Sequence, residues 1–230
     1  MCFAPYISLS TFIIEFLLAI FFLLNNPKDN LNRIIALLSL LLGVYQLNEF
    51  LICITDVHLF TILALSVTAL LPPIAISYAL IMWRKRLKYY LHLLIYSPSL
   101  FFILMFSLTN YLEESAACMT VFIEYPALGI LGSFYGFYYF VYILTATILF
   151  YLASSTMKSV YEKRLLYLGM LGVFIFTVPT AIFLIFLPMM YVQFASILCE
   201  FAILLAIEFI IVLWYKNKHK INYIAKTKHI

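Results

Sequence analysis

The sequence FTILALSVTALLPPIAISYALIMW, residues 60–83, decides the fold class, and the basic tripeptide Arg84-Lys85-Arg86 follows it directly. The run carries no charged side chain and is longer than the roughly 20 apolar residues that a helix needs to cross a bilayer. A spanning segment must satisfy its own backbone hydrogen bonds, and long continuous runs are typical of helices rather than of barrel strands. Residues 60–83 therefore predict a transmembrane helix with a basic boundary.

The composition extends this interpretation to the whole chain. Of the 230 residues, 66% are hydrophobic and 10% are charged, and the mean hydropathy is +1.09. Soluble globular chains carry about 25% charged residues, so a soluble fold is excluded. Seven apolar runs are visible, at residues 6–24, 34–55, 60–83, 91–109, 127–152, 165–187 and 190–214. We predict an all-α integral membrane protein, with a seven-helix transmembrane domain over residues 1–214 and a basic tail over residues 215–230.

The charges predict the orientation of this bundle. All fourteen Lys and Arg residues follow the first, third, fifth or seventh run, whereas the opposite connections hold acidic residues and none of these cations. Because Lys and Arg accumulate on the cytoplasmic side, we expect the N-terminus outside and the C-terminus in the cytoplasm of a multi-pass protein in the cell (inner) membrane. The same rule explains the net charge of +4, so we expect no nucleic-acid partner.

Catalytic and metal-binding motifs are missing from the sequence. It has no Gly-rich phosphate loop, no paired-Cys motif and no His-x-x-x-His spacing, so we expect no catalytic residue, no metal and no cofactor, and no enzyme. Cys53 and Cys118 both lie near the predicted outer face, where a disulfide is chemically permitted, and Cys2 is a further candidate. Spacing alone leaves the pairing open.

Acidic residues inside the predicted spans are the first functional candidates, because charge at membrane depth is costly. Glu15 and Glu200 lie near the middle of the first and seventh runs. Every Lys and Arg lies at the predicted cytoplasmic boundary, so neither acid has a basic side chain at its depth in the membrane. We predict that these protonatable groups are protonated and hydrogen-bonded, or that they bind a cation. Glu208 is one to two turns above Lys216, and we expect it to reach the interface.

The second run concentrates polar side chains at Tyr45, Gln46, Asn48 and Glu49. Spacings of three and four place Tyr45, Asn48 and Glu49 on one helical face, which should point into the bundle. The four residues are our candidate ligand-binding site in the outer half of the membrane. The alternative is that they form interhelical hydrogen bonds that hold the bundle together.

Proline and glycine residues suggest where helices bend and approach one another. A proline inside a helix removes a hydrogen bond, which predicts kinks at four positions: Pro72, Pro73, Pro98 and Pro179. The fifth run contains small residues at spacings that permit close helix packing, namely Gly129, Gly132, Ser133 and Gly136.

The order of several features resembles the seven-helix amino-terminal sensor region of bacterial and archaeal histidine kinases and related signalling proteins. The matching features are Asn32-Arg33, Tyr45, Glu49, Leu71-Pro72-Pro73 and Lys163-Arg164. The resemblance implies a membrane-embedded input module that senses a ligand or membrane state and shifts a cytoplasmic effector. Only sixteen residues follow Trp214, too few for a catalytic fold, so we expect a cytoplasmic signalling partner or a separate effector.

Two other functions remain open on the sequence. One is a small proton-coupled transporter that uses Glu15 and Glu200, and the other is a structural subunit of a membrane complex. In each case the bilayer is a partner, and a homo-oligomer is possible.

Overall fold

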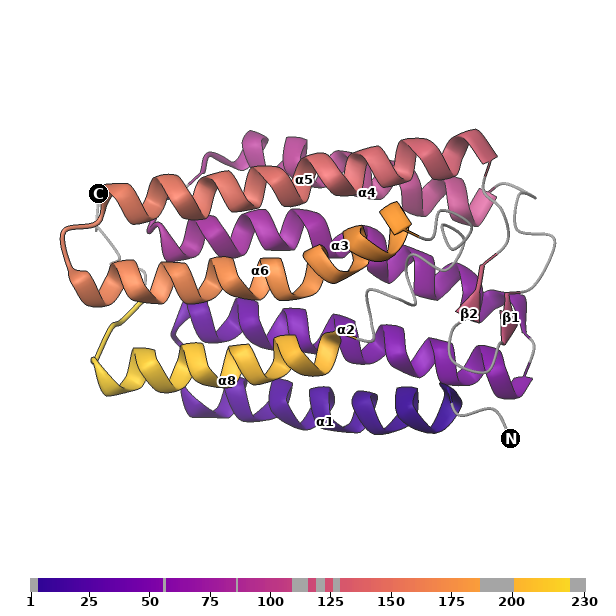
Figure 1. The fold of residues 1–230 in the computed structure, drawn as a ribbon, viewed down its shortest axis with the longest axis horizontal. Coiled ribbons are helices and arrows are strands. Elements are labelled where there is room, and N and C mark those ends of the chain that lie inside the picture. The colour runs from indigo at the N-terminus through magenta and orange to yellow at the C-terminus, as the bar shows by residue number, and fades with distance from the viewer. Residues whose placement is uncertain are drawn as a thin grey trace.

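The computed structural model describes residues 4–55, 57–85, 87–108, 116–118, 123–125, 129–186 and 201–223. Within these residues the chain forms seven helices and one short strand pair (Figure 1). The elements are α1 (Ala4–Asn25), α2 (Asn30–Thr55), α3 (His58–Met82), α4 (Tyr89–Leu108), β1 (Ala117–Cys118), β2 (Ile123–Glu124), α5 (Gly129–Thr156), α6 (Val160–Phe186) and α8 (Ala202–Lys218). The helices lie along one long axis, which confirms the predicted all-α bundle.

Five helices, α1 to α5, are long and apolar enough to cross a membrane. Each overlaps one of the first five predicted runs, because a long and mainly apolar sequence favours a helix in lipid. The sixth predicted run overlaps α6 over residues 165–186, and the seventh overlaps α8. Residue 187 and the first part of the seventh run, residues 190–200, lie outside the described residues. The architecture is thus that of a helical membrane protein.

The bundle has apolar side chains on its outside and several polar ones inside. Large hydrophobic residues such as Leu24, Phe137 and Trp214 are well exposed, as lipid contact requires. In contrast, the side chains of Glu15 and Asp29 are completely buried. This distribution is the reverse of that in a soluble protein, where exposed apolar patches of this extent are rare.

The predicted bending and packing residues have different outcomes. Both Pro72 and Pro73 lie inside α3, which continues through them, and Ser77 Oγ donates to the Pro73 carbonyl at 3.1 Å. Pro98 lies inside α4, and Pro179 falls within the bounds of α6. A Cβ added to Gly136 would meet nothing within 4 Å, so this glycine makes no close helix contact within the described chain, contrary to our prediction.

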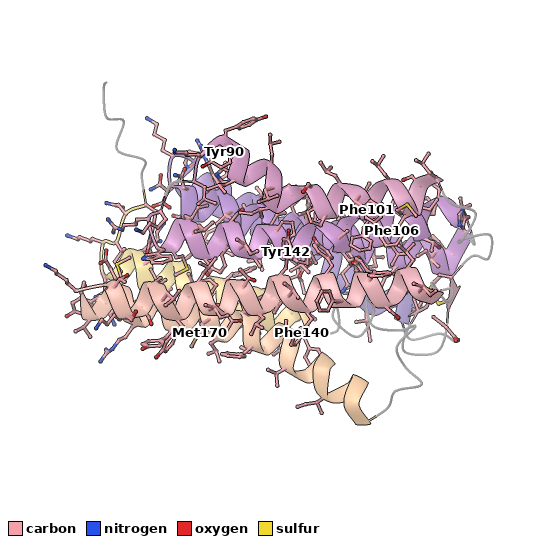
Figure 2. The ribbon with its side chains drawn as sticks, turned by 90° about the horizontal axis from the view of Figure 1, so that it is seen from above. Tyr90, Phe101, Phe106, Phe140, Tyr142 and Met170 are labelled. Carbon is pink, nitrogen blue, oxygen red and sulfur yellow. A yellow bond between two sulfur atoms is a disulfide. The ribbon has the colours of Figure 1, made fainter. Side chains whose placement is uncertain are left out.

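The two ends of the bundle differ in chemistry. At one end the antiparallel strand pair β1–β2 covers the helices, and a disulfide joins Cys53, near the end of α2, to Cys118 in β1 (Figure 2). The nitrogen atoms of the basic side chains gather at the opposite end. We call these the disulfide end and the basic end. Of the pairings that the sequence left open, the structure therefore shows Cys53–Cys118.

Candidate functional site

A cluster of hydroxyl and carboxyl groups lies near the disulfide end. The Tyr45 hydroxyl donates to Glu49 Oε1 at 2.7 Å, and Ser8 Oγ of α1 donates to Glu49 Oε2 at 3.4 Å. The hydroxyl oxygens of Tyr45 and Tyr125 are 2.7 Å apart. Since Tyr45 gives its proton to Glu49, Tyr125 is the donor in this second bond. We call Ser8, Tyr45, Glu49 and Tyr125 the tyrosine–glutamate cluster.

The strand pair covers this cluster. Tyr125 directly follows β2, and its side chain is 4% exposed, while Tyr45 beneath it is completely buried. The Cys53–Cys118 disulfide fixes β1 to the end of α2, and the Ala116 amide donates to Thr61 Oγ1 on α3 at 3.4 Å. The covering segment is therefore attached to both α2 and α3 at the end where the cluster lies.

The structure brings together only part of the predicted ligand-binding set. Tyr45 and Glu49 meet in the cluster, whereas Asn48 Nδ2 donates to the Val44 carbonyl of its own helix at 2.8 Å. Gln46 is buried as well. The sequence did not single out Tyr125, because the partner comes from a connection 80 residues away and helical spacing cannot reveal it.

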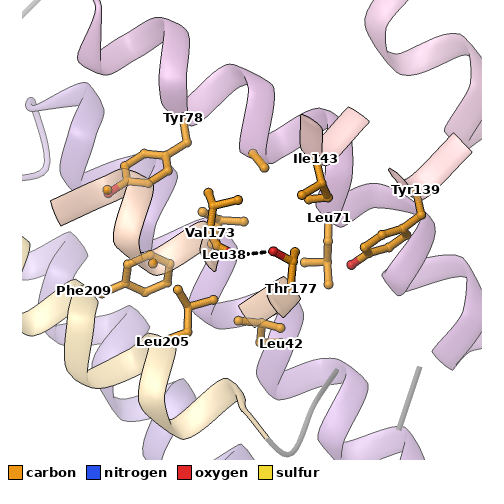
Figure 3. A pocket seen from close by; sticks show the side chains of 13 residues that line it. Leu38, Leu42, Leu71, Tyr78, Tyr139, Ile143, Val173, Thr177, Leu205 and Phe209 are labelled. Carbon is orange, nitrogen blue, oxygen red and sulfur yellow. Dashed lines mark hydrogen bonds between the residues drawn. The ribbon is translucent and has the colours of Figure 1, made fainter. Parts of the chain in front are cut away.

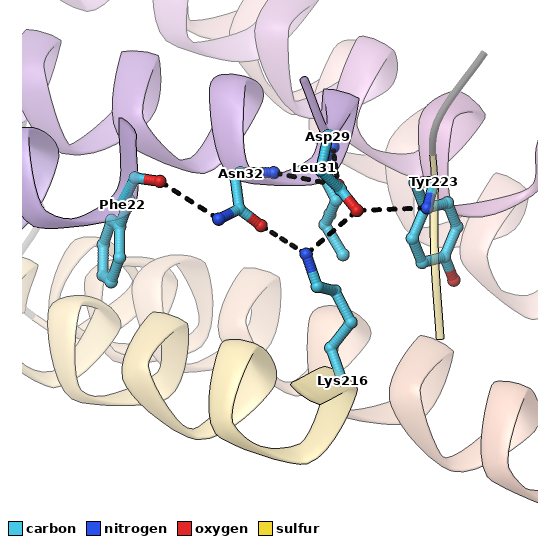
Figure 4. Close-up of polar contacts among 6 residues, drawn as sticks. All are labelled: Phe22, Asp29, Leu31, Asn32, Lys216 and Tyr223. Carbon is cyan, nitrogen blue, oxygen red and sulfur yellow. Dashed lines mark hydrogen bonds and ion pairs between the residues drawn. The ribbon is translucent and has the colours of Figure 1, made fainter. Parts of the chain in front are cut away.

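A second cluster lies at the basic end and ties α8 to the start of α2 (Figure 4). Lys216 Nζ forms an ion pair with Asp29 Oδ2 at 3.1 Å and donates to Asn32 Oδ1. The other Asp29 oxygen accepts the Leu31 amide at 2.9 Å, so the same carboxylate caps the N-terminus of α2. We call Asp29, Asn32 and Lys216 the lysine–aspartate cluster.

Further hydrogen bonds join this cluster to its surroundings. Asn32 Nδ2 donates to the Phe22 carbonyl of α1 at 3.0 Å, and the Tyr223 amide donates to Asp29 Oδ2 at 3.1 Å. Lys216 lies beyond the predicted span, and only 2% of its side-chain surface is exposed. Burial lowers the pKa of its ammonium group, and the neighbouring Asp29 carboxylate opposes that shift.

The segment that follows α8 folds back onto the basic end. Lys220 adopts a left-handed φ of 52°, and the Ile221 amide donates to the Lys216 carbonyl at 3.0 Å, which is the bond pattern of a Schellman helix end. Ile221 and Tyr223 are buried as a result. The helix therefore extends past the predicted boundary at residue 214, and part of the predicted basic tail packs on the bundle.

This returning segment contacts the other helix connections at the basic end. The Arg84 guanidinium lies 5.1 Å from the centre of the Tyr223 ring and pairs with Glu162 at 2.6 Å. The His219 ring stacks on Tyr161 with centres 4.2 Å apart. Residues 216–223 thus contact the α1–α2 connection through Asp29, the α3–α4 connection through Arg84 and the first turn of α6 through Tyr161.

Two of the remaining predicted acids, Glu15 and Glu208, are buried inside the bundle. Glu15 is completely buried against α2, with its Cβ 3.4 Å from the position that a Cβ would take on Gly43. Glu208 is 3% exposed and packs against Gly172, so the expectation that it reaches the interface is wrong. Neither carboxyl group has a hydrogen-bond partner among the described residues. Glu200 lies outside the described residues.

A small cavity of about 40 Å³ lies between α2, α3, α5, α6 and α8 (Figure 3). Its wall is mainly aliphatic, and Tyr78, Tyr139 and Thr177 contribute the polar side chains. The Thr177 hydroxyl donates to the Val173 carbonyl of its own helix at 2.7 Å. Among the described residues, no group of three His, Cys, Asp or Glu side chains is placed to hold a metal ion.

In comparisons with protein-family models, curated proteins and solved structures, none matches this chain. The resemblance to histidine-kinase sensor regions therefore depends on the sequence features named above.

Proposed function

We propose that this protein is a membrane-embedded sensor that relays a change at its disulfide end to its cytoplasmic C-terminal segment and from there to a separate signalling partner. One observation carries the proposal: α2 bears residues of both polar clusters. Tyr45 and Glu49 lie in its second half, and Asn32 lies in its first turns, next to Asp29. A single helix thus connects the covered cluster to the contacts that hold α8.

The orientation that this function requires has two independent supports. The cations gather at the basic end, which by the positive-inside rule is cytoplasmic. The disulfide lies at the opposite end, and disulfides persist in oxidising compartments outside the cytoplasm. We therefore place the tyrosine–glutamate cluster toward the outside and the lysine–aspartate cluster toward the cytoplasm, with α6 and α8 as the sixth and seventh spans.

The relay works if the bundle has two arrangements that the signal stabilises unequally. A ligand or a change of membrane state that separates Tyr125 from Tyr45 would break one hydrogen bond of the tyrosine–glutamate cluster and alter how α2 packs. A shift of α2 moves Asn32 relative to Lys216, and the contacts of Ile221 and Tyr223 change with it. The partner then binds residues that are buried in the present arrangement.

Thiol accessibility at the C-terminal segment tests this relay. In a chain with Cys2→Ser and Cys199→Ser and an intact disulfide, an Ile221→Cys thiol should react slowly with a soluble maleimide, because Ile221 is buried. Adding Glu49→Gln or Tyr125→Phe removes bonds of the tyrosine–glutamate cluster and should accelerate that labelling several-fold.

Thr55→Val is the matched control, since Thr55 is exposed near the same end and its hydroxyl bonds to the Leu51 carbonyl and the Val57 amide, neither of which belongs to the tyrosine–glutamate cluster. This variant should leave the labelling rate unchanged. Equal rates in the Glu49→Gln variant and the parent, with both proteins folded, would contradict the relay.

A second candidate, a proton-coupled transporter, is favoured by one observation. The Glu15 and Glu208 carboxyl groups are buried without partners among the described residues, as protonatable transport sites often are. Solute movement in proteoliposomes that depends on pH and disappears in Glu15→Gln would support transport instead of sensing.

A further inference from the structure

The turn between α3 and α4 holds two exposed lysines at the ends of these helices. Arg84 adopts a left-handed φ of 60°, and the Lys85 amide donates to the Leu80 carbonyl at 3.0 Å, so α3 ends in a Schellman motif. At the start of α4, the Lys88 carbonyl accepts the Leu91 amide at 3.0 Å. The helix ends therefore fix the backbone of both Lys85 and Lys88, while their side chains remain exposed.

An aromatic ring lies against each of these lysine side chains. Lys85 Nζ is 5.3 Å from the centre of the Trp83 ring, and Lys88 Nζ is 6.0 Å from the centre of the Tyr90 ring. Trp83 Nε1 donates to Thr156 Oγ1 at the end of α5 at 2.9 Å, which orients the indole ring. Tyr90 lies near the nitrogen atoms that gather at the basic end (Figure 2). We call Trp83, Lys85, Lys88 and Tyr90 the lysine–aromatic corner.

The corner carries positive charge that no described carboxylate neutralises. Asp29 and Glu162 are the described acids at the basic end, and each forms an ion pair with another cation. Within the described part of the chain, neither Lys85 nor Lys88 takes part in a salt bridge. Charge complementarity therefore favours an anionic ligand at the corner.

The apolar surface beside the corner favours a lipid over a soluble acidic partner. Leu93 and Leu94, about one turn into α4, are 52% and 66% exposed, and Tyr89 before them is exposed as well. Trp and Tyr rings prefer the headgroup level of a bilayer, and Lys side chains there are attracted to anionic headgroups. Cations at the helix boundary with apolar side chains next to them match the two parts of a phospholipid, its headgroup and its acyl chains.

We propose that the lysine–aromatic corner binds an anionic phospholipid, whose phosphate contacts Lys85 and Lys88 and whose acyl chains lie along the exposed face of α4. The site is separate from both polar clusters and does not depend on the proposed sensor function. Its lipid selectivity is local, and so it differs from the general attraction between the basic end and an anionic leaflet.

Tryptophan quenching by brominated lipids tests the site with the full chain in vesicles. Trp83 and Trp214 are the two tryptophans, so a Trp214→Phe parent leaves Trp83 as the single reporter. The vesicles contain phosphatidylcholine and phosphatidylglycerol, with bromine on the acyl chains of one lipid at a time. Because bromine quenches tryptophan at contact, we expect phosphatidylglycerol to occupy the position beside Trp83 several-fold more often than phosphatidylcholine at equal mole fraction. In Lys85→Gln/Lys88→Gln this preference should disappear.

Lys28→Gln/Lys218→Gln is the matched control, because it removes two exposed lysines that lie outside the corner. It should leave the preference at Trp83 unchanged, and Lys85→Arg/Lys88→Arg should retain it. Equal occupancy by the two lipids in the parent would overturn the proposal. An equal loss of preference in both Lys→Gln double variants would also overturn it, because only a general attraction to the leaflet would then be acting.

A free phosphate group is distinguished from a lipid by the choice of salt. Replacing chloride with inorganic phosphate at the same ionic strength should leave the preference for phosphatidylglycerol unchanged. Loss of the preference in phosphate would mean that the corner binds a free anion, which would overturn the lipid assignment. The quenching measurements are independent of the thiol-labelling experiment, so the two proposals can fail separately.

Discussion

At the scale of single residues, the buried pair of Lys216 and Asp29 is the least expected feature. Charged groups removed from water are tolerated when each has a partner and further hydrogen bonds. Asp29 meets this condition with the Leu31 and Tyr223 amides, and Lys216 meets it with Asn32. The pair therefore holds α8 against the α1–α2 connection. Its stability depends on the ion pair together with the hydrogen bonds that each charged group makes to other residues.

Removal of one partner should be costly for this reason. We expect Asp29→Asn to destabilise the protein by about 3 kcal/mol, because it leaves the buried Lys216 charge without a counter-ion. The double variant Asp29→Asn/Lys216→Met should recover part of that loss. Thermal unfolding in micelles measures both, with Lys218→Met as the control on an exposed neighbour. Additive losses in the double variant would contradict a coupled pair.

The Asp29→Asn variant should also respond to pH. With the carboxylate gone, burial alone acts on Lys216 and lowers its pKa further in the folded protein. The unfolded chain then binds more protons than the folded one, so stability should rise as the pH increases toward the ordinary Lys value of about 10.4. Unfolding temperatures across this range, compared with the wild type, test the direction. If the unfolding temperature of Asp29→Asn rose no more steeply with pH than that of the wild type, the role of Asp29 as the counter-ion of Lys216 would be contradicted.

At the scale of elements, the strand pair matters because it carries Tyr125 onto α2. Two-residue strands have little stability of their own. Their position is fixed by the Cys53–Cys118 disulfide and by the contact between Ala116 and Thr61. The bond between the Tyr45 and Tyr125 hydroxyls therefore depends on a covalent link elsewhere in the segment.

Loss of the disulfide should weaken this arrangement. It joins residues 65 positions apart, for which chain entropy gives a stabilisation of up to about 4 kcal/mol. The gain should be smaller here, because the helices restrict the chain even after unfolding in a membrane. We expect Cys53→Ser/Cys118→Ser to lower the unfolding temperature and to abolish its sensitivity to reductant. Cys2→Ser should change neither property, and a wild type insensitive to reductant would contradict the role of the bridge.

At the scale of the whole molecule, the two ends carry opposite chemistry. Basic side chains gather at one end, and the disulfide and strand pair lie at the other. The positive-inside rule and the redox conditions of the two compartments both favour the orientation that we propose.

Fusions at chosen positions test the orientation. A green fluorescent protein fused after residue 230 should fluoresce, because it folds in the cytoplasm, while alkaline phosphatase at the same place should be inactive. Phosphatase fused after Val57, at the disulfide end, should be active, since its own disulfides form outside the cytoplasm. The reverse pattern would overturn the assignment of the two ends and with it the proposed direction of the relay.

The sequence alone determined that this is a helical membrane protein and where α1 to α5 lie. Those features follow from local properties, because a run of about 20 mainly apolar residues is long enough to cross a bilayer as a helix. The sequence also indicated that Tyr45 and Glu49 face the bundle interior. Tertiary structure decided their partners: Tyr125 comes from a distant connection, Asn48 bonds to its own helix, and Glu208 lies against Gly172 rather than at the interface. The pairing of Asp29 with Lys216 across 187 positions likewise depends on how α8 packs beside α2, which no local pattern encodes.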